Sequence, residues 1–169
     1  MNTKNTLSKE ILDKFSDTKV FVETGTSNGD GLQEAINHGY DELHSIEHDK
    51  QLFYNALIRF QKNDKVVLHQ GDSTMYLWRI LHNINQPITF WLDAHDEKTT
   101  SVIEELGAIQ NHFITNHTIL IDDIRYFRNN YWKINLSELK GKILKINPSY
   151  KIQYVDSLFF EKDILVAAL

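Results

Sequence analysis

Two clusters of acidic residues, each directly after an apolar run, are where this sequence can carry acid–base or metal chemistry. Asp93 and His95 follow one run, and Asp122 and Asp123 follow another. Because one residue separates Asp93 from His95, both side chains can point to the same side of an extended turn. Histidine has an ordinary pKa of about 6.5, so it can accept a proton near pH 7. The alternative is structural: Asp93 fixes the turn, and His95 caps the helix that follows.

The same acids can hold a divalent cation. Asp93, Asp122 and Asp123 offer oxygen ligands of the kind that Mg²⁺ or Ca²⁺ prefers, and a bound cation lowers the pKa of a hydroxyl group. Adjacent buried carboxylates are costly unless they are paired or liganded, and Arg125 is close in sequence. We therefore predict either a metal site here or an ion pair of one acid with Arg125. The catalytic candidates are His95, Asp93 and Asp122.

The stretch 19–31, KVFVETGTSNGDG, has the pattern of a strand, a glycine turn and the start of a helix. Gly25 and Gly29 allow a sharp turn and a close approach to a ligand, and the first amides of a helix attract anions. A dinucleotide fingerprint fails, because serine and aspartate stand where its second and third glycines belong. Glu23 and Asp30 flank the turn and disfavour a pyrophosphate. The charges of S-adenosylmethionine, an ammonium, a sulfonium and a carboxylate, suit this turn better.

A further acid follows the next predicted strand. Glu47 lies 22 residues after Gly25, a spacing at which a carboxylate can hold both ribose hydroxyls of a nucleotide-like ligand. It can also be a solvated acid beside Asp49, which would cap the following helix. His48 either lines an adenine or lies in an exposed loop.

Taken in order, five motifs resemble the class I S-adenosylmethionine-dependent methyltransferases. They are E-x-G-x-x-x-G at 23–29, SIEHD at 45–49, HQGDS at 69–73, FWLDAH at 90–95 and LIDDIRYF at 120–127. The last is similar to the strand-five signature of a small, mostly uncharacterised branch, distantly like the sugar and macrolide O-methyltransferases. The resemblance covers residues 19–169.

The resemblance implies a set of cofactor contacts. In the family, the acid at the position of Asp72 accepts a hydrogen bond from the adenine amino group, although Asp72 or Ser73 can simply cap a helix. The implied cofactor-binding residues are Glu23, Thr24, Gly25, Thr26, Ser27, Gly29, Asp30, Glu47, His48, Asp72, Ser73 and Asp93. The prolines that mark methyltransferases of adenine or amide nitrogens are missing after Asp93. The resemblance favours a hydroxyl of a sugar or another small molecule as the methyl acceptor.

The implied fold is α/β, a Rossmann-like methyltransferase fold with helices on both faces of a seven-stranded, mostly parallel sheet. The expected strand order is 3-2-1-4-5-7-6, with strand seven antiparallel. The patterns place strands at 20–22, 42–46, 66–69, 88–92, 118–121, 150–158 and 163–168, and helices at 30–37, 50–61, 102–113 and 135–146.

Three local features complete the predicted fold. An N-terminal segment, 1–18, contains a short helix and serves as scaffold or as a lid. Met75, Leu77, Trp78 and Leu81 form the buried face of another helix, and Leu144 belongs to the apolar face of the helix at 135–146. A short polar turn at 161–162 joins the last two strands into a hairpin, where an NAD-binding domain would add a sixth parallel strand.

Composition bounds the class of protein. A chain of 169 residues with 41% hydrophobic content fits a single domain over 1–169. The net charge is −5 and the basic residues are scattered, so we expect no nucleic-acid partner. Cysteine is absent and no apolar run is long enough to span a membrane. We expect a cytoplasmic protein with no membrane partner, and a homodimer is compatible with its small size.

Two other functions stay open. The first is an NAD-dependent enzyme, which would need the missing glycines. The second is a non-catalytic cofactor-binding partner subunit, which the small size permits. The segment 125–132, rich in aromatic and hydrogen-bonding side chains, either holds a sugar or similar acceptor or is a packed loop.

Overall fold

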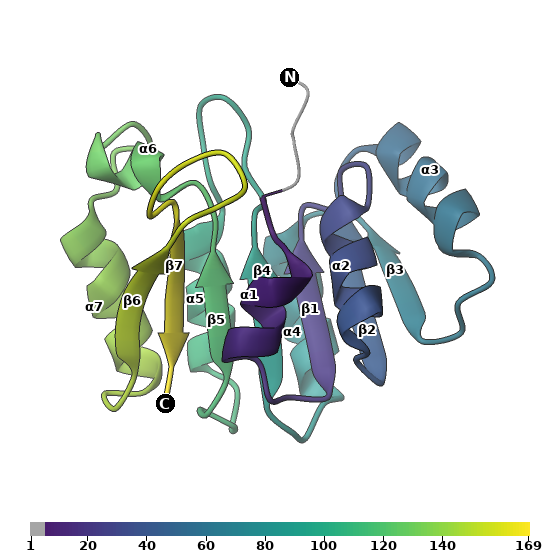
Figure 1. Ribbon diagram of the computed structural model, residues 1–169, viewed down its shortest axis with the longest axis horizontal. Coiled ribbons are helices and arrows are strands. Elements are labelled where there is room, and N and C mark those ends of the chain that lie inside the picture. Colours follow the sequence, from purple (N-terminus) through teal and green to yellow (C-terminus); the bar gives the residue numbers. More distant parts are fainter. Residues whose placement is uncertain (1–5) are drawn as a thin grey trace.

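The computed structural model describes residues 6–169 and contains one seven-stranded sheet in the order β3-β2-β1-β4-β5-β7-β6. The predicted order is confirmed. Strands β1 to β5 are parallel, and β7 is antiparallel to both β5 and β6. Figure 1 shows the carboxyl ends of the parallel strands along one edge of the sheet. The strands are β1 (Val20–Thr24), β2 (Glu42–Glu47), β3 (Val66–Gln70), β4 (Ile88–Leu92), β5 (Thr118–Ile121), β6 (Lys151–Val155) and β7 (Ile164–Ala168).

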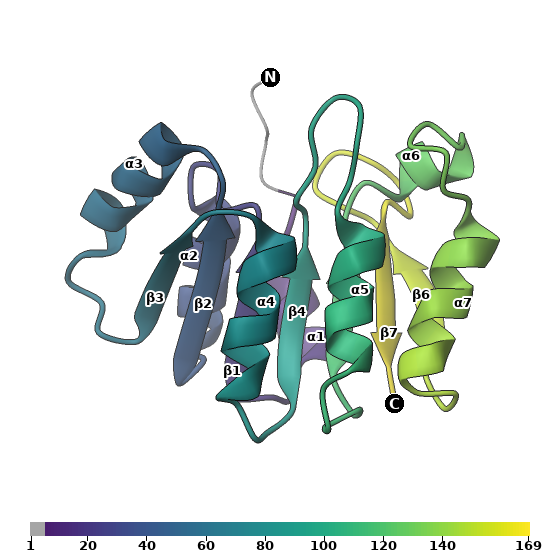
Figure 2. The same cartoon turned by 180° about the vertical axis from the view of Figure 1, so that it is seen from behind.

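Helices cover both faces of the sheet, as predicted (Figures 1 and 2). Strand residues alternate between two cores, because successive side chains point to opposite faces: Val20 and Val22 pack into one, and Phe21 into the other. One face carries α1 (Lys9–Phe15), α2 (Asp30–His38) and α3 (Lys50–Phe60). The other carries α4 (Ser73–His82), α5 (Val102–Gln110) and α7 (Leu136–Ile146), and the short α6 (Ile124–Arg128) follows β5.

Local sequence signals set most helix ends. Ser8, Asp49, Asp72 and Asn135 each accept a hydrogen bond from a backbone amide of the first turn that follows. Such caps satisfy amides that the helix leaves without a partner. Gly39 ends α2 in a left-handed conformation, with φ of 107°. The predicted helical part of the segment 1–18 is confirmed as α1, whereas residues 1–5 lie outside the described part of the chain.

Two predictions about helix faces were wrong. Met75 is 60% exposed and Trp78 is 50% exposed, while Leu77 and Leu81 are buried. On a helix of 3.6 residues per turn these four positions spread over about 160°, and the buried stripe of α4 covers only the part of this arc that carries Leu77 and Leu81. Leu144 of α7 is also exposed.

The connection between the last two strands also differs from the prediction. Strand β6 ends at Val155, so a loop over 156–163 replaces the short polar turn. Leu158, Phe159 and Phe160 are exposed in this loop, which lies at the same edge of the sheet as the carboxyl ends of the parallel strands (Figure 1). Within residues 6–169, no helix has the length and apolarity that crossing a membrane requires.

Two buried histidines, His112 and His117, form a hydrogen-bonded chain at the amino-terminal ends of β4 and β5. The amide of Ile88 donates to His117 Nδ1 at 3.1 Å, His117 Nε2 lies 3.1 Å from His112 Nδ1, and His112 Nε2 lies 2.9 Å from the carbonyl of Ile84. Since a carbonyl only accepts, His112 donates from Nε2 and accepts from His117. Every position in this chain is satisfied when both rings are neutral.

The hydrogen-bonded pair of His112 and His117 predicts that the protein loses stability in acid. Burial, together with the charge of His112, lowers the pKa of His117 to about 4 from 6.5. The unfolded state therefore binds more protons between these values, so the stabilisation is complete above pH 6.5 and is lost as the pH falls towards 4. Urea unfolding of the native protein should show a loss of about 2 kcal/mol from this group between pH 7.5 and pH 5.

The matched variants are His117→Asn and His82→Asn, the second at an exposed site on α4. His117→Asn should be less stable at pH 7.5 and lose less stability on acidification, and His82→Asn should follow the native protein. Burial also lowers the pKa of His69 to about 4, so part of the pH dependence should persist in both variants. An unchanged pH dependence in His117→Asn would show that His117 is not its source.

Candidate functional site

A cavity of about 350 Å³ opens at the carboxyl ends of β1, β2, β3 and β4. Strand β1 pairs with β2 on one side and β4 on the other, so the chain order reverses here. Open α/β sheets bind ligands at such a switch point. The lining residues are Gly25, Ser27, Asn28, Ile46, Glu47, His48, Leu52, Gly71, Ser73, Asp93, Ala94 and His95.

The two glycines of the turn after β1 have different roles. Gly25 has φ of +85°, and a Cβ atom there would lie 2.8 Å from the carbonyl oxygen of Asp93. It thus lets the turns after β1 and β4 touch. Gly29 has φ of +80°, and its Cβ would lie 2.6 Å from the Phe60 ring of α3. Gly29 therefore permits packing of the loop on α3 and does not line the cavity.

Glu47 is the best-oriented acid of the cavity. Its Oε2 accepts a hydrogen bond from the amide of Ser27 at 2.7 Å, and its Oε1 accepts one from the amide of Asp49 at 2.8 Å. The side chain is buried but lines the cavity. Two fixed oxygens with free lone pairs can accept further hydrogen bonds from a ligand.

Glu23 lies in the protein interior behind the cavity. It is 1% exposed, accepts a hydrogen bond from the Ser45 hydroxyl, and does not line the cavity. Burial raises its pKa to about 8, a shift that the Ser45 hydrogen bond opposes and the charge of Glu47 reinforces. Glu23 is therefore mostly protonated at neutral pH, whereas the sequence argument treated it as a carboxylate.

The twelve predicted cofactor contacts divide into two groups of six. Gly25, Ser27, Glu47, His48, Ser73 and Asp93 line the cavity, whereas Glu23, Thr24, Thr26, Gly29, Asp30 and Asp72 do not. Asp30 faces Arg59, whose Nη1 donates to Asp30 Oδ1 at 2.7 Å and to the carbonyl of Asn28 at 2.6 Å. Asp72 caps α4 through the amide of Thr74. These two acids stabilise the loop and the helix start that border the cavity.

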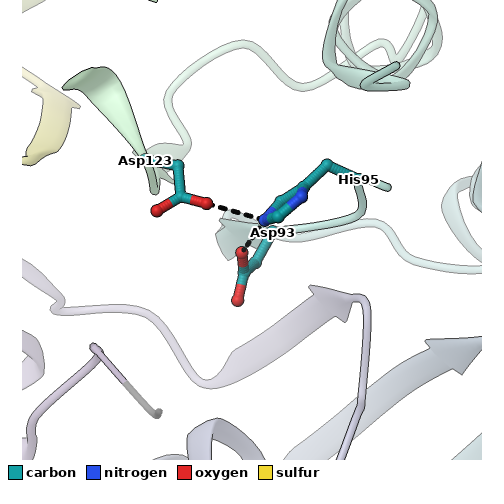
Figure 3. A group of neighbouring side chains, drawn as sticks. All are labelled: Asp93, His95 and Asp123. Carbon is teal, nitrogen blue, oxygen red and sulfur yellow. Dashed lines mark ion pairs between the residues drawn. The ribbon is translucent and has the colours of Figure 1, made fainter. Parts of the chain in front are cut away.

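Asp93, His95 and Asp123 converge beside the cavity, although they come from the ends of two different strands (Figure 3). His95 Nε2 lies 2.7 Å from Asp123 Oδ2 and 3.6 Å from Asp93 Oδ1. Arg125 Nη1 lies 2.6 Å from the other oxygen of Asp123, so one predicted ion pair is present. Asp123 has φ of 59°, a left-handed conformation in which aspartate is better tolerated than most residues.

The environment shifts the pKa values of this group. Burial and the neighbouring charges of Asp122 and Asp123 raise the pKa of Asp93. Burial favours the neutral form of His95, but the hydrogen bond and the charge of Asp123 outweigh it and raise the pKa of His95. The imidazole is thus more protonated at neutral pH than its ordinary pKa of about 6.5 implies.

The predicted metal acids do not all meet at one point. One group of three possible ligands, with atoms within 4.8 Å of one another, contains Asp93, His95 and Asp123, and a second contains Asp122, Asp123 and Asp163. Arg125 contacts both Asp123 and Asp163 of the second group, and its guanidinium already supplies the positive charge there. The first group shares only Asp123 with these Arg125 contacts, and it has His95 in the place predicted for Asp122.

Asp122 contacts the N-terminal segment and also lines a small cavity together with Asp93 and His95. It is 5% exposed, and its Oδ2 accepts a hydrogen bond from the Thr6 hydroxyl. Burial and the charge of Asp123 raise its pKa to about 7. Asp122 belongs to the second group of possible ligands, and its roles as a catalytic residue and metal ligand stay predictions.

The segment 125–132 forms a packed wall with an exposed rim. Trp132 is 8% exposed and its ring centroid lies 5.1 Å from that of His95 and 4.9 Å from that of Tyr126. Tyr131 is exposed beside them. Packing thus explains the buried aromatics of this segment, and Tyr131 remains available to an acceptor.

Sequence reasoning missed Glu105 of α5. It is fully buried, and its Oε1 accepts hydrogen bonds from the Ser73 hydroxyl at 2.5 Å and the Ser101 hydroxyl at 2.8 Å. Burial raises its pKa to about 7, although both hydroxyls oppose the shift. Two adjacent glutamates, Glu104 and Glu105, inside the otherwise apolar pattern VIEELGAIQ were the available signal.

No model of a known protein family matches the sequence, and no curated protein matches it. Solved structures do match. An O-methyltransferase from Bacillus cereus, in complex with S-adenosylhomocysteine, has a TM-score of 0.71 at 13% identity over 95% of this chain and 78% of that one. An O-methyltransferase from Streptomyces achromogenes involved in tomaymycin synthesis, in complex with S-adenosylmethionine, has a TM-score of 0.67 at 11% identity over 95% and 77%.

Spermidine synthase from Thermotoga maritima is also similar, with a TM-score of 0.65 at 12% identity. The match covers 90% of this chain but 54% of the synthase. At these identities the comparisons show the fold, and the strand order agrees with it.

Proposed function

We propose that this chain, which has the fold of the class I S-adenosylmethionine-dependent methyltransferases, is itself such an enzyme and methylates a hydroxyl of a small molecule, a sugar being the leading class. The observation that carries the proposal is the cavity at the strand-order reversal, with Glu47 on one side and Asp93 and His95 on the other. It combines a cofactor-sized recess with acid–base groups at its rim.

The cofactor assignment follows from the donors and acceptors of this cavity. The Glu47 oxygens are held by the amides of Ser27 and Asp49 and would accept the ribose hydroxyls. Ser73 and His48 lie on the wall where the adenine would fit. Ser27 and Asp30 stand where a dinucleotide fingerprint has its second and third glycines, which argues against the dinucleotide alternative.

Methyl transfer to an alcohol needs alignment and a proton acceptor. The C–S bond of the sulfonium breaks as the C–O bond forms, and the hydroxyl proton must leave to a base. We assign this base to His95, which Asp123 and Trp132 position and which must first lose its own proton because its pKa is raised. The rate should therefore increase with pH until His95 is neutral.

A divalent cation is the alternative aid to deprotonation. Asp93, Asp123 and His95 would hold it, and when bound it would lower the pKa of the acceptor hydroxyl. Two carboxylates and an imidazole suit a transition metal such as Mn²⁺, whereas Mg²⁺ prefers oxygen ligands throughout. The observation that supports a cation is the donor set itself, which would fit one once Asp123 exchanges its contact with His95 for the metal.

The test is turnover, measured as S-adenosylhomocysteine release over a panel of sugars and other small hydroxyl compounds. His95→Ala should lower the turnover number by about 10²- to 10⁴-fold, the usual contribution of a general base, with cofactor affinity retained. His82→Ala, on the exposed side of α4, is the matched control and should keep full activity.

Chelation distinguishes deprotonation by His95 from deprotonation assisted by a metal ion. Full activity in His95→Ala would rule out the base, and activity abolished by chelation and restored by Mn²⁺ or Mg²⁺ would assign deprotonation to the metal. Asp93→Ala should impair turnover under either scheme. Tight cofactor binding without turnover on any acceptor would favour the non-catalytic partner subunit.

A further inference from the structure

A second, much smaller cavity adjoins the acid–histidine group. Its volume is about 10 Å³, which is room for about one water molecule. The ends of β4 and β5 supply Asp93 and Asp122 to its wall, α5 supplies Glu105, and the connection before α7 supplies Trp132.

Three buried polar atoms without a hydrogen-bond partner belong to residues that line this cavity. They are Glu105 Oε2, Asp122 Oδ1 and Trp132 Nε1, and among the described residues only the Tyr154 hydroxyl shares this condition. The other oxygens of the two acids are occupied, Glu105 Oε1 by two serine hydroxyls and Asp122 Oδ2 by Thr6. Buried polar groups rarely stay unpaired, because desolvation without a hydrogen bond is costly.

We infer that this cavity binds one water molecule, which donates to Glu105 Oε2 and Asp122 Oδ1 and accepts from Trp132 Nε1. Water has two donors and can accept from the indole, so one molecule would satisfy all three atoms. A cation does not fit, because the indole N–H presents its positive end. An anion does not fit beside two carboxyl groups.

The water would connect two walls of the candidate site. Glu105 holds the Ser73 hydroxyl at the large cavity, and Asp122 holds Thr6 of the N-terminal segment. The Trp132 ring packs at a tilt against the His95 ring. This inference does not depend on the proposed function, because it rests on the cavity and on the three unpaired atoms alone.

The test is water-selective NMR on the full-length, ¹⁵N-labelled native protein. The chain has three tryptophans, so three indole N–H signals are expected. Their assignment comes from the loss of one signal in Trp132→Phe and of another in Trp78→Phe. The Trp132 signal should show cross-peaks to water of opposite sign in NOE and ROE spectra, which identifies a bound molecule with a long residence time.

The exposed Trp78 indole is the matched control and should show no such long-lived contact. The native spectrum carries the test, and Trp78→Phe together with Trp91→Phe completes the assignment if Trp132→Phe does not fold. Absence of the water cross-peak at Trp132 would overturn the inference. A crystal structure at atomic resolution with a protein group, an ion or nothing bonded to Trp132 Nε1 would overturn it as well.

Discussion

Gly25→Ala is expected to lower the melting temperature by about 4–20 °C and to abolish cofactor binding. The native φ of +85° costs a residue with a Cβ about 1–2 kcal/mol, and the new methyl group would lie 2.8 Å from the carbonyl oxygen of Asp93. Relieving such an overlap typically costs about 1–3 kcal/mol, and in a chain of this size each kcal/mol shifts the melting temperature by about 2–4 °C. Because relief must separate the turns after β1 and β4, the cavity between them would change shape.

Gly39→Ala is the matched control. Gly39 also has a positive φ, +107°, but a Cβ there meets nothing within 4 Å. This variant carries backbone strain without the overlap, and it lies at the end of α2 and outside the cavity lining. It should lose some stability and keep cofactor binding. Equal losses of binding in the two variants would contradict the role of the contact between Gly25 and Asp93.

Glu47→Ala is expected to weaken the binding of S-adenosylmethionine by about 10- to 100-fold. Hydrogen bonds to a charged group contribute about 1.5–3 kcal/mol, and each 1.4 kcal/mol is a factor of ten in affinity. The variant loses the proposed acceptors for the ribose hydroxyls and also the acceptor of the Ser27 amide. Both losses act on the same wall of the cavity.

Calorimetric titration measures this effect. Glu42→Ala, at the opposite end of β2, is the control and should bind the cofactor with native affinity. Glu47→Gln keeps one acceptor oxygen and should fall between Glu47→Ala and the native protein. Unchanged affinity in Glu47→Ala would remove the assignment of Glu47 to the ribose.

The family resemblance predicted the strand order, and local patterns predicted the caps at Asp49 and Asp72 and the acids at the strand ends. Asp49 and Asp72 show why this succeeds: a cap depends on a residue and the amides two or three positions later, so the signal is local. The prediction that Met75 and Trp78 are buried was wrong, because it used their apolar type and ignored their angular position on the helix.

Contacts between distant segments explain the remaining differences in the site. The sequence predicted Asp30 as a cofactor contact because it follows the glycine turn. In the structure it pairs instead with Arg59, which lies 29 residues away in sequence. His95 pairs with Asp123 from another strand, which raises a pKa that sequence reasoning could only take at its reference value. Glu23 differs for the same reason, because its burial depends on packing around the whole sheet.

The measurement that tests the central claim most directly is a pair of titrations of the native protein, one with S-adenosylhomocysteine and one with NAD. The cavity between Gly25, Glu47 and Asp93 predicts binding of one S-adenosylhomocysteine per chain and no binding of NAD. Saturable binding of NAD without binding of S-adenosylhomocysteine would contradict it.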